Sequence, residues 1–387
     1  MRKIKKVLAL ALVGAMALTA FSGCGKSGKS GSSDKFYIGG IGPVTGGAAV
    51  YGTAVKNAAQ IAVDEINAAG GINGYQVEYK FEDDVADGET AINAYNTLKD
   101  WGMQILMGTV TSGACESVVP LTGDDNMFQI TPSASAASLV EGKNVYQVCF
   151  TDPNQGSASA KYIGEHKVAS KIGVIYDSSD IYSTGIYEKF AEEAKNQDFE
   201  IVETQFFTKD TKTDFSVQVQ ACKDSGAELI FLPIYYQEAS MILTEANEIG
   251  YDVTFFGCDG LDGLLAVEGF DKNLAEGVML LTPFSADATD DLTSKFVASY
   301  KEKYNDIPNQ FAADAYDAIY IIKAAIEKAD ITPESSISEI GDALEAAMTE
   351  ISVDGTTGTG MTWNEKGEVN KAPKAVVIKD GTYVSAE

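Results

Sequence analysis

Two hydrophobic periodicities alternate along most of this chain. Short runs of mostly apolar and β-branched residues have the length of buried strands, and longer segments between them place apolar residues about every 3.6 positions. Two series of strands are predicted. The first series lies at 36–41, 76–81, 104–107 and 127–130, and the second at 171–176, 200–206, 228–232 and 253–256.

Helices are predicted between these strands. Because strand and helix alternate, the strands are expected to run parallel, in sheets covered by helices on both faces. Two such series predict an α/β fold of two Rossmann-like lobes. The helices of this part are expected at 51–69, 181–197, 215–224 and 239–249.

The last third of the chain has a different pattern. Three helical segments are expected at 290–304, 311–328 and 337–348, and the glycine-rich stretch 355–360 then interrupts the periodicity. A terminal hairpin is predicted at 376–384, because Asp380-Gly381 is a favoured two-residue turn between apolar runs.

The N-terminal pattern is typical of an exported protein. A basic start at 2–6 precedes an apolar stretch at 7–20, which is too short to span a membrane and predicts a signal peptide over 1–23. The following Phe-Ser-Gly-Cys24 resembles a lipoprotein cleavage site, so Cys24 is predicted to carry the lipid. Residues 24–35, rich in Gly, Ser and Lys, are then expected to form a flexible tether. Ordinary cleavage nearby, with Cys24 unmodified, is the alternative.

Composition and length indicate which partners are excluded and how many domains to expect. The chain carries 56 Asp and Glu against 29 Lys and Arg, a formal net charge of −27, so it is expected to repel nucleic acid and anionic lipid headgroups. Its 387 residues exceed one typical core and favour two domains. We therefore expect membrane contact through the lipid alone, and a monomer.

Neither a metal nor a nucleotide cofactor is expected. His166 is the only histidine, and the body cysteines form no C-x-x-C pair. Gly28-Lys29-Ser30 completes a P-loop pattern, but it lies in the tether rather than between a strand and a helix. A hydrolase is disfavoured by the single histidine and by the lack of a G-x-S-x-G elbow. The pairing of the body cysteines, Cys115, Cys149, Cys222 and Cys258, stays open, with buried free thiols favoured.

Loops after the predicted strands hold the candidate binding residues, because open parallel sheets bind ligands at the carboxyl ends of their strands. Ser112 starts a predicted helix, where free N–H groups suit a carboxylate. Asp259 offers the charge that an ammonium group needs. Each residue has a simpler reading: Ser112 as an N-cap, Asp259 as a turn former. The other candidates are Ser133 and Ser135 for polar contacts, and Tyr51, Tyr182, Tyr235 and Phe311 for apolar walls.

In order along the chain, these landmarks resemble the type I periplasmic binding proteins for leucine, isoleucine and valine that serve ABC importers. The resemblance covers most of the chain after the tether. It rests on Gly42-Pro-Val-Thr with Tyr51-Gly52, on 68–74 (Ala-Ala-Gly-Gly-Ile-Asn-Gly), on 130–135 (Ile-Thr-Pro-Ser-Ala-Ser), on 181–185 (Ile-Tyr-Ser-Thr-Gly), on 235–238 (Tyr-Tyr-Gln-Glu) and on 361–367 (Met-Thr-Trp-Asn-Glu-Lys-Gly).

The resemblance implies roles for the candidates. Ser112 matches the serine that holds the ligand α-carboxylate, Ser135 matches a residue on the same amino-acid head, and Ser133 contributes backbone. Asp259 matches the acid that pairs with the α-ammonium, a position where relatives often carry the longer Glu. A cysteine pair of some relatives is missing here, with Ala86 and Thr111 in that neighbourhood. Tyr182 and Tyr235 match aromatic residues of the family that close on the ligand from the second lobe. Tyr51 and Phe311 match positions that line the pocket for the ligand side chain.

The resemblance also implies two lobes joined by a three-stranded hinge. Crossings are expected near Asp152, Pro283 and Trp363, which divides the chain into a first lobe of 36–152 plus 284–362 and a second lobe of 153–283 plus 363–387.

The expected function is therefore a non-enzymatic, lipid-anchored receptor on the outer side of the cell membrane. It captures an α-amino acid, of the branched-chain aliphatic kind, by hinge closure and delivers it to an ABC permease. The alternatives are the same fold with a short amide, urea, an aromatic acid, a nucleoside or another small ligand, and a sensor that does not transport.

Overall fold

Two mainly parallel sheets organise residues 34–386, the part of the chain that the computed structural model describes. The predicted leader, Cys24 and the tether up to residue 33 lie outside the described residues. Lys35, expected in the tether, already begins the first strand. The first sheet has the order β2-β1-β3-β4-β5 and is parallel throughout. Its strands are β1 (Lys35–Gly42), β2 (Gln76–Asp83), β3 (Ile105–Gly108), β4 (Gln129–Thr131) and β5 (Val145–Gln147).

The second sheet has the order β12-β11-β10-β9-β8-β6-β7. Only β11 and β12, the expected C-terminal hairpin, run antiparallel to their neighbours. Two sheets of this kind confirm the two-lobed α/β fold. The strands are β6 (Lys171–Asp177), β7 (Glu200–Phe207), β8 (Leu229–Leu232), β9 (Thr254–Gly257), β10 (Met279–Thr282), β11 (Lys374–Lys379) and β12 (Thr382–Ser385).

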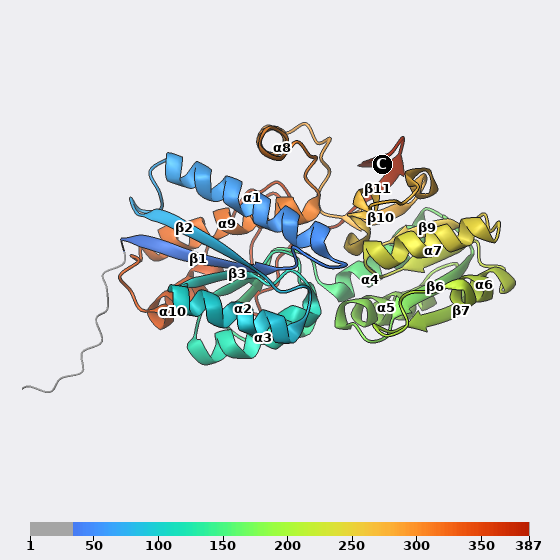
Figure 1. The fold of residues 1–387 in the computed structure, drawn as a ribbon, viewed down its shortest axis with the longest axis horizontal. Helices are drawn as coiled ribbons and strands as arrows, with labels where there is room; N and C mark the ends of the chain where they lie inside the picture. Colours follow the sequence, from blue (N-terminus) through green and yellow to red (C-terminus); the bar gives the residue numbers. More distant parts are fainter. Residues whose placement is uncertain (1–33, 387) are drawn as a thin grey trace, which may run out of the picture. The chain divides into compact units, whose positions relative to one another are not determined.

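Helices cover both faces of each sheet. On the first sheet, α1 packs against α9 on one face and α2 against α3 on the other (Figure 1). On the second sheet, α4 packs against α5 and α6 against α7. The helices are α1 (Ala49–Ala68), α2 (Gly88–Trp101), α3 (Ser112–Asp125), α4 (Asp152–Glu165), α5 (Ile181–Glu193), α6 (Ser216–Asp224), α7 (Tyr236–Glu248), α8 (Asp291–Tyr304), α9 (Gln310–Ala329) and α10 (Ile337–Met348).

Short 3-10 turns complete the fold. One of them, η3, follows β9 and brings Asp259 to the carboxyl end of the second sheet. None was predicted from periodicity, since a single turn carries no 3.6-residue repeat. They are η1 (Ala137–Val140), η2 (Ala194–Asn196), η3 (Asp259–Leu261), η4 (Leu264–Ala266) and η5 (Lys272–Ala275).

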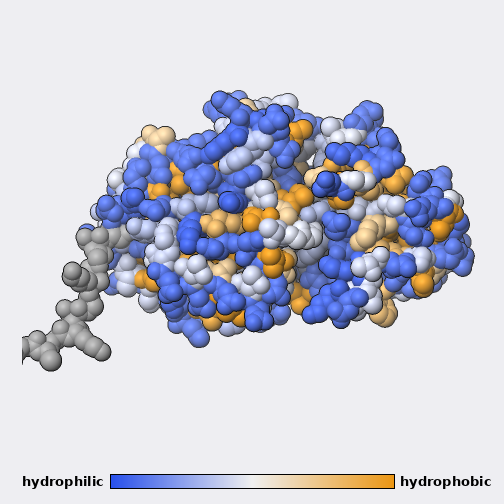
Figure 2. All heavy atoms as spheres, viewed as in Figure 1, coloured by the Kyte–Doolittle hydropathy of each residue, from blue (hydrophilic) through white to orange (hydrophobic). Residues whose placement is uncertain are grey.

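The burial of the central strands explains why the apolar runs predicted them. All four residues of β3 and of β8 are buried, as expected for strands covered by helices on both faces. The outer surface is the opposite: hydrophilic side chains dominate the face seen in Figure 2, with apolar groups scattered between them. Cys115, Cys149, Cys222 and Cys258 are buried free thiols. Within 34–386, no helix combines the length and the apolarity that crossing a bilayer requires.

A glycine brings α1 close to the loop after β1. A Cβ on Gly52 would lie 2.0 Å from the carbonyl oxygen of Pro43, so no other residue fits without moving backbone. This close packing positions Tyr51, the neighbouring residue, in the core at the start of α1, where it contacts residues of the second lobe.

Candidate functional site

Seven of the eight predicted site residues line one cavity between the carboxyl ends of the two sheets. Ser135 is not on its wall, but its backbone N–H donates to the Ser112 hydroxyl at 3.1 Å. Sequence reasoning missed three wall residues, Val110, Thr111 and Gly260. The predicted residues on the wall are Tyr51, Ser112, Ser133, Tyr182, Tyr235, Asp259 and Phe311.

The first lobe supplies neutral polar groups. Ser112 lies in the first turn of α3, and its hydroxyl accepts the backbone N–H groups of Ser135 and Ala136, at 3.1 and 3.2 Å. Ser112 thus joins α3 to the loop after β4, while its own hydroxyl hydrogen remains available. Because the N-terminus of a helix carries a partial positive charge, this wall suits an anion.

Ser133 and Ser135 have different environments from each other. The Ser133 hydroxyl donates to the carbonyl of Val110 at 2.7 Å, which leaves its backbone for any contact with a ligand. Ser135 is fully buried, and its carbonyl accepts the backbone N–H of Asp152 at 2.9 Å. This bond connects the predicted carboxylate-binding loop directly to the start of α4.

The second lobe supplies the acidic wall. Asp259 is 4% exposed, and its Oδ1 accepts a hydrogen bond from the Tyr182 hydroxyl at 2.7 Å. The same hydroxyl accepts the backbone N–H of Gly260 at 2.9 Å. A Cβ on Gly260 would lie 2.6 Å from the Tyr182 hydroxyl, so glycine permits this contact. Tyr182 and Gly260 therefore fix the direction of the Asp259 carboxyl.

Among the described residues, no Lys or Arg side chain forms a salt bridge with Asp259, so its negative charge is uncompensated. Burial raises its pKa to about 7, although the hydrogen bond from the Tyr182 hydroxyl opposes the shift. Lys371 is outside the cavity wall and is paired with Asp314 at 2.8 Å, with both side chains almost completely buried. The charge of Asp314 raises the pKa of Asp259 further. An ammonium group beside Asp259 would supply the missing positive charge.

Aromatic rings form the rest of the wall. Tyr51 stacks on Phe311 with ring centroids 4.1 Å apart and meets Tyr235 edge-on at 5.6 Å. Tyr235 in turn lies 5.1 Å from Tyr182. Three of these four residues are buried, and Tyr235 is half-buried, so the rings join the two lobes across the cavity. Such a lining favours an apolar side chain on the ligand.

Further polar atoms beside the cavity lack a hydrogen bond of standard geometry to any described residue. They are Thr111 Oγ1, Ser135 Oγ, both carboxyl oxygens of Asp152 and Gln155 Nε2. Burial raises the pKa of Asp152 well above its usual range. Buried polar groups normally have partners, so this cluster marks the site as built for additional polar contacts. From sequence, Asp152 was named only as an expected crossing between the lobes, and Gln155 was not singled out.

The space inside is small. The cavity holds about 10 Å³ of water-accessible volume, roughly what a single water molecule requires. An amino acid is several times larger, so its entry requires the two lobes to separate and close again.

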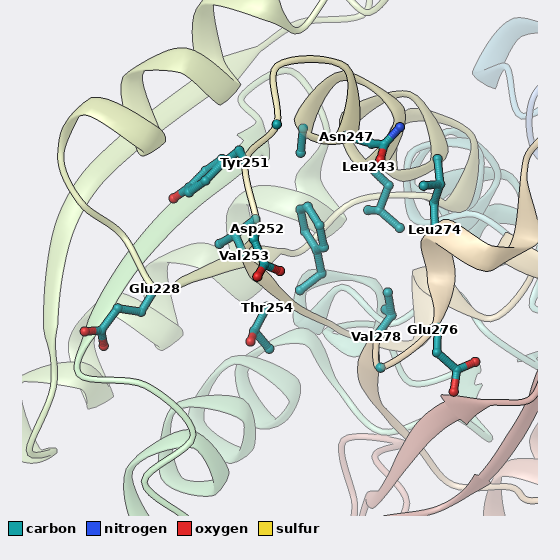
Figure 3. A pocket seen from close by; sticks show the side chains of 14 residues that line it. Glu228, Leu243, Asn247, Tyr251, Asp252, Val253, Thr254, Leu274, Glu276 and Val278 are labelled. Carbon is teal, nitrogen blue, oxygen red and sulfur yellow. The ribbon is translucent and has the colours of Figure 1, made fainter.

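A larger hollow lies elsewhere and contains none of the predicted site residues. It is an open depression at the amino ends of β8 and β9, and Figure 3 shows Glu228 and Glu276 at opposite sides of it. Glu228 accepts the backbone N–H of Ser170, and Glu276 accepts that of Asp380. These acids have structural partners, and the hollow lies away from the strand ends at which open parallel sheets bind ligands.

The chain is similar to known proteins over most of its length. A family model described as "Periplasmic binding protein" matches residues 35–382. The leucine-, isoleucine-, valine-, threonine- and alanine-binding protein of Pseudomonas aeruginosa is 27% identical over 361 residues, covering 92% of each chain. The Leu/Ile/Val-binding protein homolog 3 of Brucella melitensis is 29% identical over 356 residues, covering 90% of this chain and 93% of the relative.

Among solved structures, the substrate-binding protein LivJ of a branched-chain amino acid transporter from Streptococcus pneumoniae, in complex with isoleucine, superposes with a TM-score of 0.83. It is 28% identical, and the alignment covers 91% of this chain and 99% of that one.

Proposed function

Because the chain belongs to the periplasmic binding protein family, a family of extracytoplasmic solute-binding proteins, we propose that it captures an α-amino acid with a branched aliphatic side chain and delivers it to an ABC permease. One observation carries this proposal. A single cavity has an uncompensated acid, Asp259, on the second lobe and the helix N-terminus at Ser112 on the first.

This pairing of groups fits a zwitterion. The ammonium would pair with Asp259, the carboxylate with the N-terminus of α3 and the Ser112 hydroxyl, and the side chain with Tyr51 and Phe311. Burying both charges is tolerable only when both are paired, which favours an amino acid over a neutral amide. The names of the relatives from Pseudomonas and Brucella support the branched-chain class.

Hinge closure between two lobes is part of the proposal. The lobe boundaries expected near Asp152 and Pro283 are kept. For the third crossing we propose a position after residue 370 instead of near Trp363. Two contacts support it: the indole of Trp363 donates to the carbonyl of Gln147 at 2.8 Å, and Gly367 accepts the Gln147 N–H. Those contacts associate this segment with β5 of the first sheet.

A thermal-shift screen of the twenty amino acids, with small amides, urea, benzoate and nucleosides, tests the ligand class. A ligand that binds only the folded state raises Tm by mass action, and we expect leucine, isoleucine and valine to give the largest shifts. Stabilisation by an amide, benzoate or a nucleoside, with no amino acid effective, would overturn the proposal.

Attachment through lipid at Cys24 is a separate part of the proposal, supported by the basic-then-apolar leader. Replacing Cys24 by Ala should move the protein from the membrane fraction to the soluble fraction of cells that process lipoproteins. Replacing Ser22 by Ala, next to the cleavage site, is the control and should leave the protein on membranes. Continued membrane retention of the Cys24→Ala variant would contradict the lipid anchor.

A further inference from the structure

The turn that carries Asp259 also carries a second buried acid, Asp262. Residues 259–262 follow β9, and the backbone N–H of Asp262 donates to the carbonyl of Asp259 at 2.9 Å, which closes a tight turn. Asp259 faces the cavity, whereas Asp262 lies outside its wall. Asp262 is 7% exposed, so its carboxyl also needs a partner.

The partner comes from the other lobe. Oδ2 of Asp262 accepts the backbone N–H of Gln310 at 2.7 Å, and Gln310 is the first residue of α9. Helix α9 packs against α1 and β3 and so belongs with the first sheet. A carboxylate at a helix N-terminus makes a charge-assisted hydrogen bond that the helix dipole strengthens.

Two more bonds from the first lobe reach the same turn. The side-chain amide of Gln310 donates to the carbonyl of Asp259 at 2.9 Å, and the Tyr51 hydroxyl donates to the carbonyl of Gly260. Gln310 is 1% exposed and Tyr51 is 1% exposed, so these bonds are shielded from water. Three bonds from the first lobe thus converge on a four-residue segment of the second.

The cap that Asp262 provides differs from the other cap of α9. The side chain of Asn309 accepts the Ala312 N–H at 3.0 Å within one lobe, so the proposed opening would leave this bond in place. The bond from Asp262 crosses between the lobes, so the proposed opening would break it. Opening of the lobes would leave the Gln310 N–H without its acceptor and the Asp262 carboxylate without its donor.

We infer that Asp262 and Gln310 form an interlobe clasp that couples occupancy of Asp259 to closure. The inference rests on the proposed function. A ligand held by Asp259 orients the 259–262 turn, and the same turn then presents Asp262 and two carbonyls to the first lobe. Since the clasp lowers the free energy of the closed state alone, it shifts the equilibrium toward closure and slows ligand release. Asp262 is a positioning residue, because it does not touch the cavity.

Two variants that each remove one cap of α9 test the clasp. Asp262→Ala removes the cap from the opposite lobe, and Asn309→Ala removes the cap from the same lobe. Leucine binding is measured by calorimetry and by stopped flow at pH 8, since burial raises the pKa of Asp262 to about 7 and the acid should be ionised. For Asp262→Ala we expect Kd to rise about tenfold, mainly through a faster off-rate.

For Asn309→Ala we expect a lower Tm with and without leucine, and a Kd within about twofold of the wild type. Small-angle scattering at saturating leucine should show Asp262→Ala partly open and Asn309→Ala closed. Equal off-rates and equal scattering for the two variants would overturn the clasp. If Asp262→Ala does not fold, Asp262→Asn serves instead, since it keeps the shape and removes the charge.

The two proposals fail in different ways. If leucine does not bind the wild type but benzoate does, the amino-acid proposal fails, and scattering of the two variants without ligand still tests whether the Asp262–Gln310 bond holds the lobes together. If leucine binds the wild type and Asp262→Ala equally, with equal off-rates, the clasp fails and the amino-acid proposal stands.

Discussion

The two lobes face the cavity with opposite chemistry. The first lobe presents hydroxyls and a helix N-terminus at Ser112, while the second presents Asp259 held by Tyr182. Neither wall alone distinguishes an amino acid from a simple acid or a simple amine. Only the two together, at the distance that closure sets, recognise a molecule with both charges. The difference teaches that ligand class is decided by apposition of the lobes.

The largest expected effect comes from removing the charge of the second wall. Asp259→Asn keeps the shape of the side chain but leaves the ligand ammonium without a partner, so binding should weaken by about 2–5 kcal/mol. Calorimetry with leucine measures this loss. Asp271→Asn, an exposed acid of the same lobe that caps η5, is the control and should bind normally. Unchanged affinity in Asp259→Asn would remove that residue from the site.

On the first wall, Ser112→Ala removes an acceptor as well as a ligand contact. The N–H groups of Ser135 and Ala136 lose their partner, and we expect a loss of about 1–3 kcal/mol in binding. The control is Ser117→Ala in the same helix, where the hydroxyl bonds to Gly113 only. If both variants bind leucine as the wild type does, the Ser112 hydroxyl only links α3 to the loop after β4.

The walls should also differ in their response to pH. Burial raises the pKa of Asp259 to about 7 while the lobes are together without ligand, whereas an ammonium partner requires the ionised form. Binding therefore releases a proton below this pH, and affinity should rise by up to about tenfold per pH unit until pH is near 7. Titrations from pH 5.5 to 8 measure the slope, which Asp259→Asn should reduce. A flat wild-type profile would contradict the proposed pairing.

The same acid affects folding in the opposite sense. Because the folded ligand-free state holds the proton of Asp259 to a higher pH than the unfolded state does, the free energy of unfolding should fall as pH rises from about 4 to about 7. Urea unfolding of Asp259→Asn without ligand should show a smaller decline than that of the wild type, since the amide does not titrate.

The smallest expected loss of affinity comes from Tyr51, which connects the two walls of the cavity. Tyr51→Phe keeps the ring on Phe311 but removes the hydroxyl that joins Gly260 and the Tyr236 N–H, so affinity should fall by about 0.5–1.5 kcal/mol. Tyr146→Phe is the control, because its hydroxyl bonds to Glu345 within the first lobe. Equal leucine affinities for the two variants would show that the Tyr51 hydroxyl does not contribute to closure.

Periodicity predicted the central strands well, because strands such as β3 and β8 are buried on both faces and read as continuous apolar runs. It missed α2, α4, β5 and β10. The three residues of β5 are too few to show a period, and α4 begins Asp152-Pro-Asn-Gln with little apolar content. Likewise, Ser112 and Asp259 were identified because each follows a strand, whereas Thr111 and Asp152 have no distinguishing neighbours in sequence.

The sequence by itself determined the strand–helix alternation, the acidic surface and the post-strand positions of Ser112 and Asp259, since these depend on local periodicity and composition. The tertiary structure alone decided that Asp259 faces Tyr182, that Asp152 lies buried beside Ser135, and that Asp262 caps a helix of the opposite lobe. The last contact joins residues 48 positions apart. Such contacts depend on how two separately formed sheets meet, and no local pattern of residues encodes that distance.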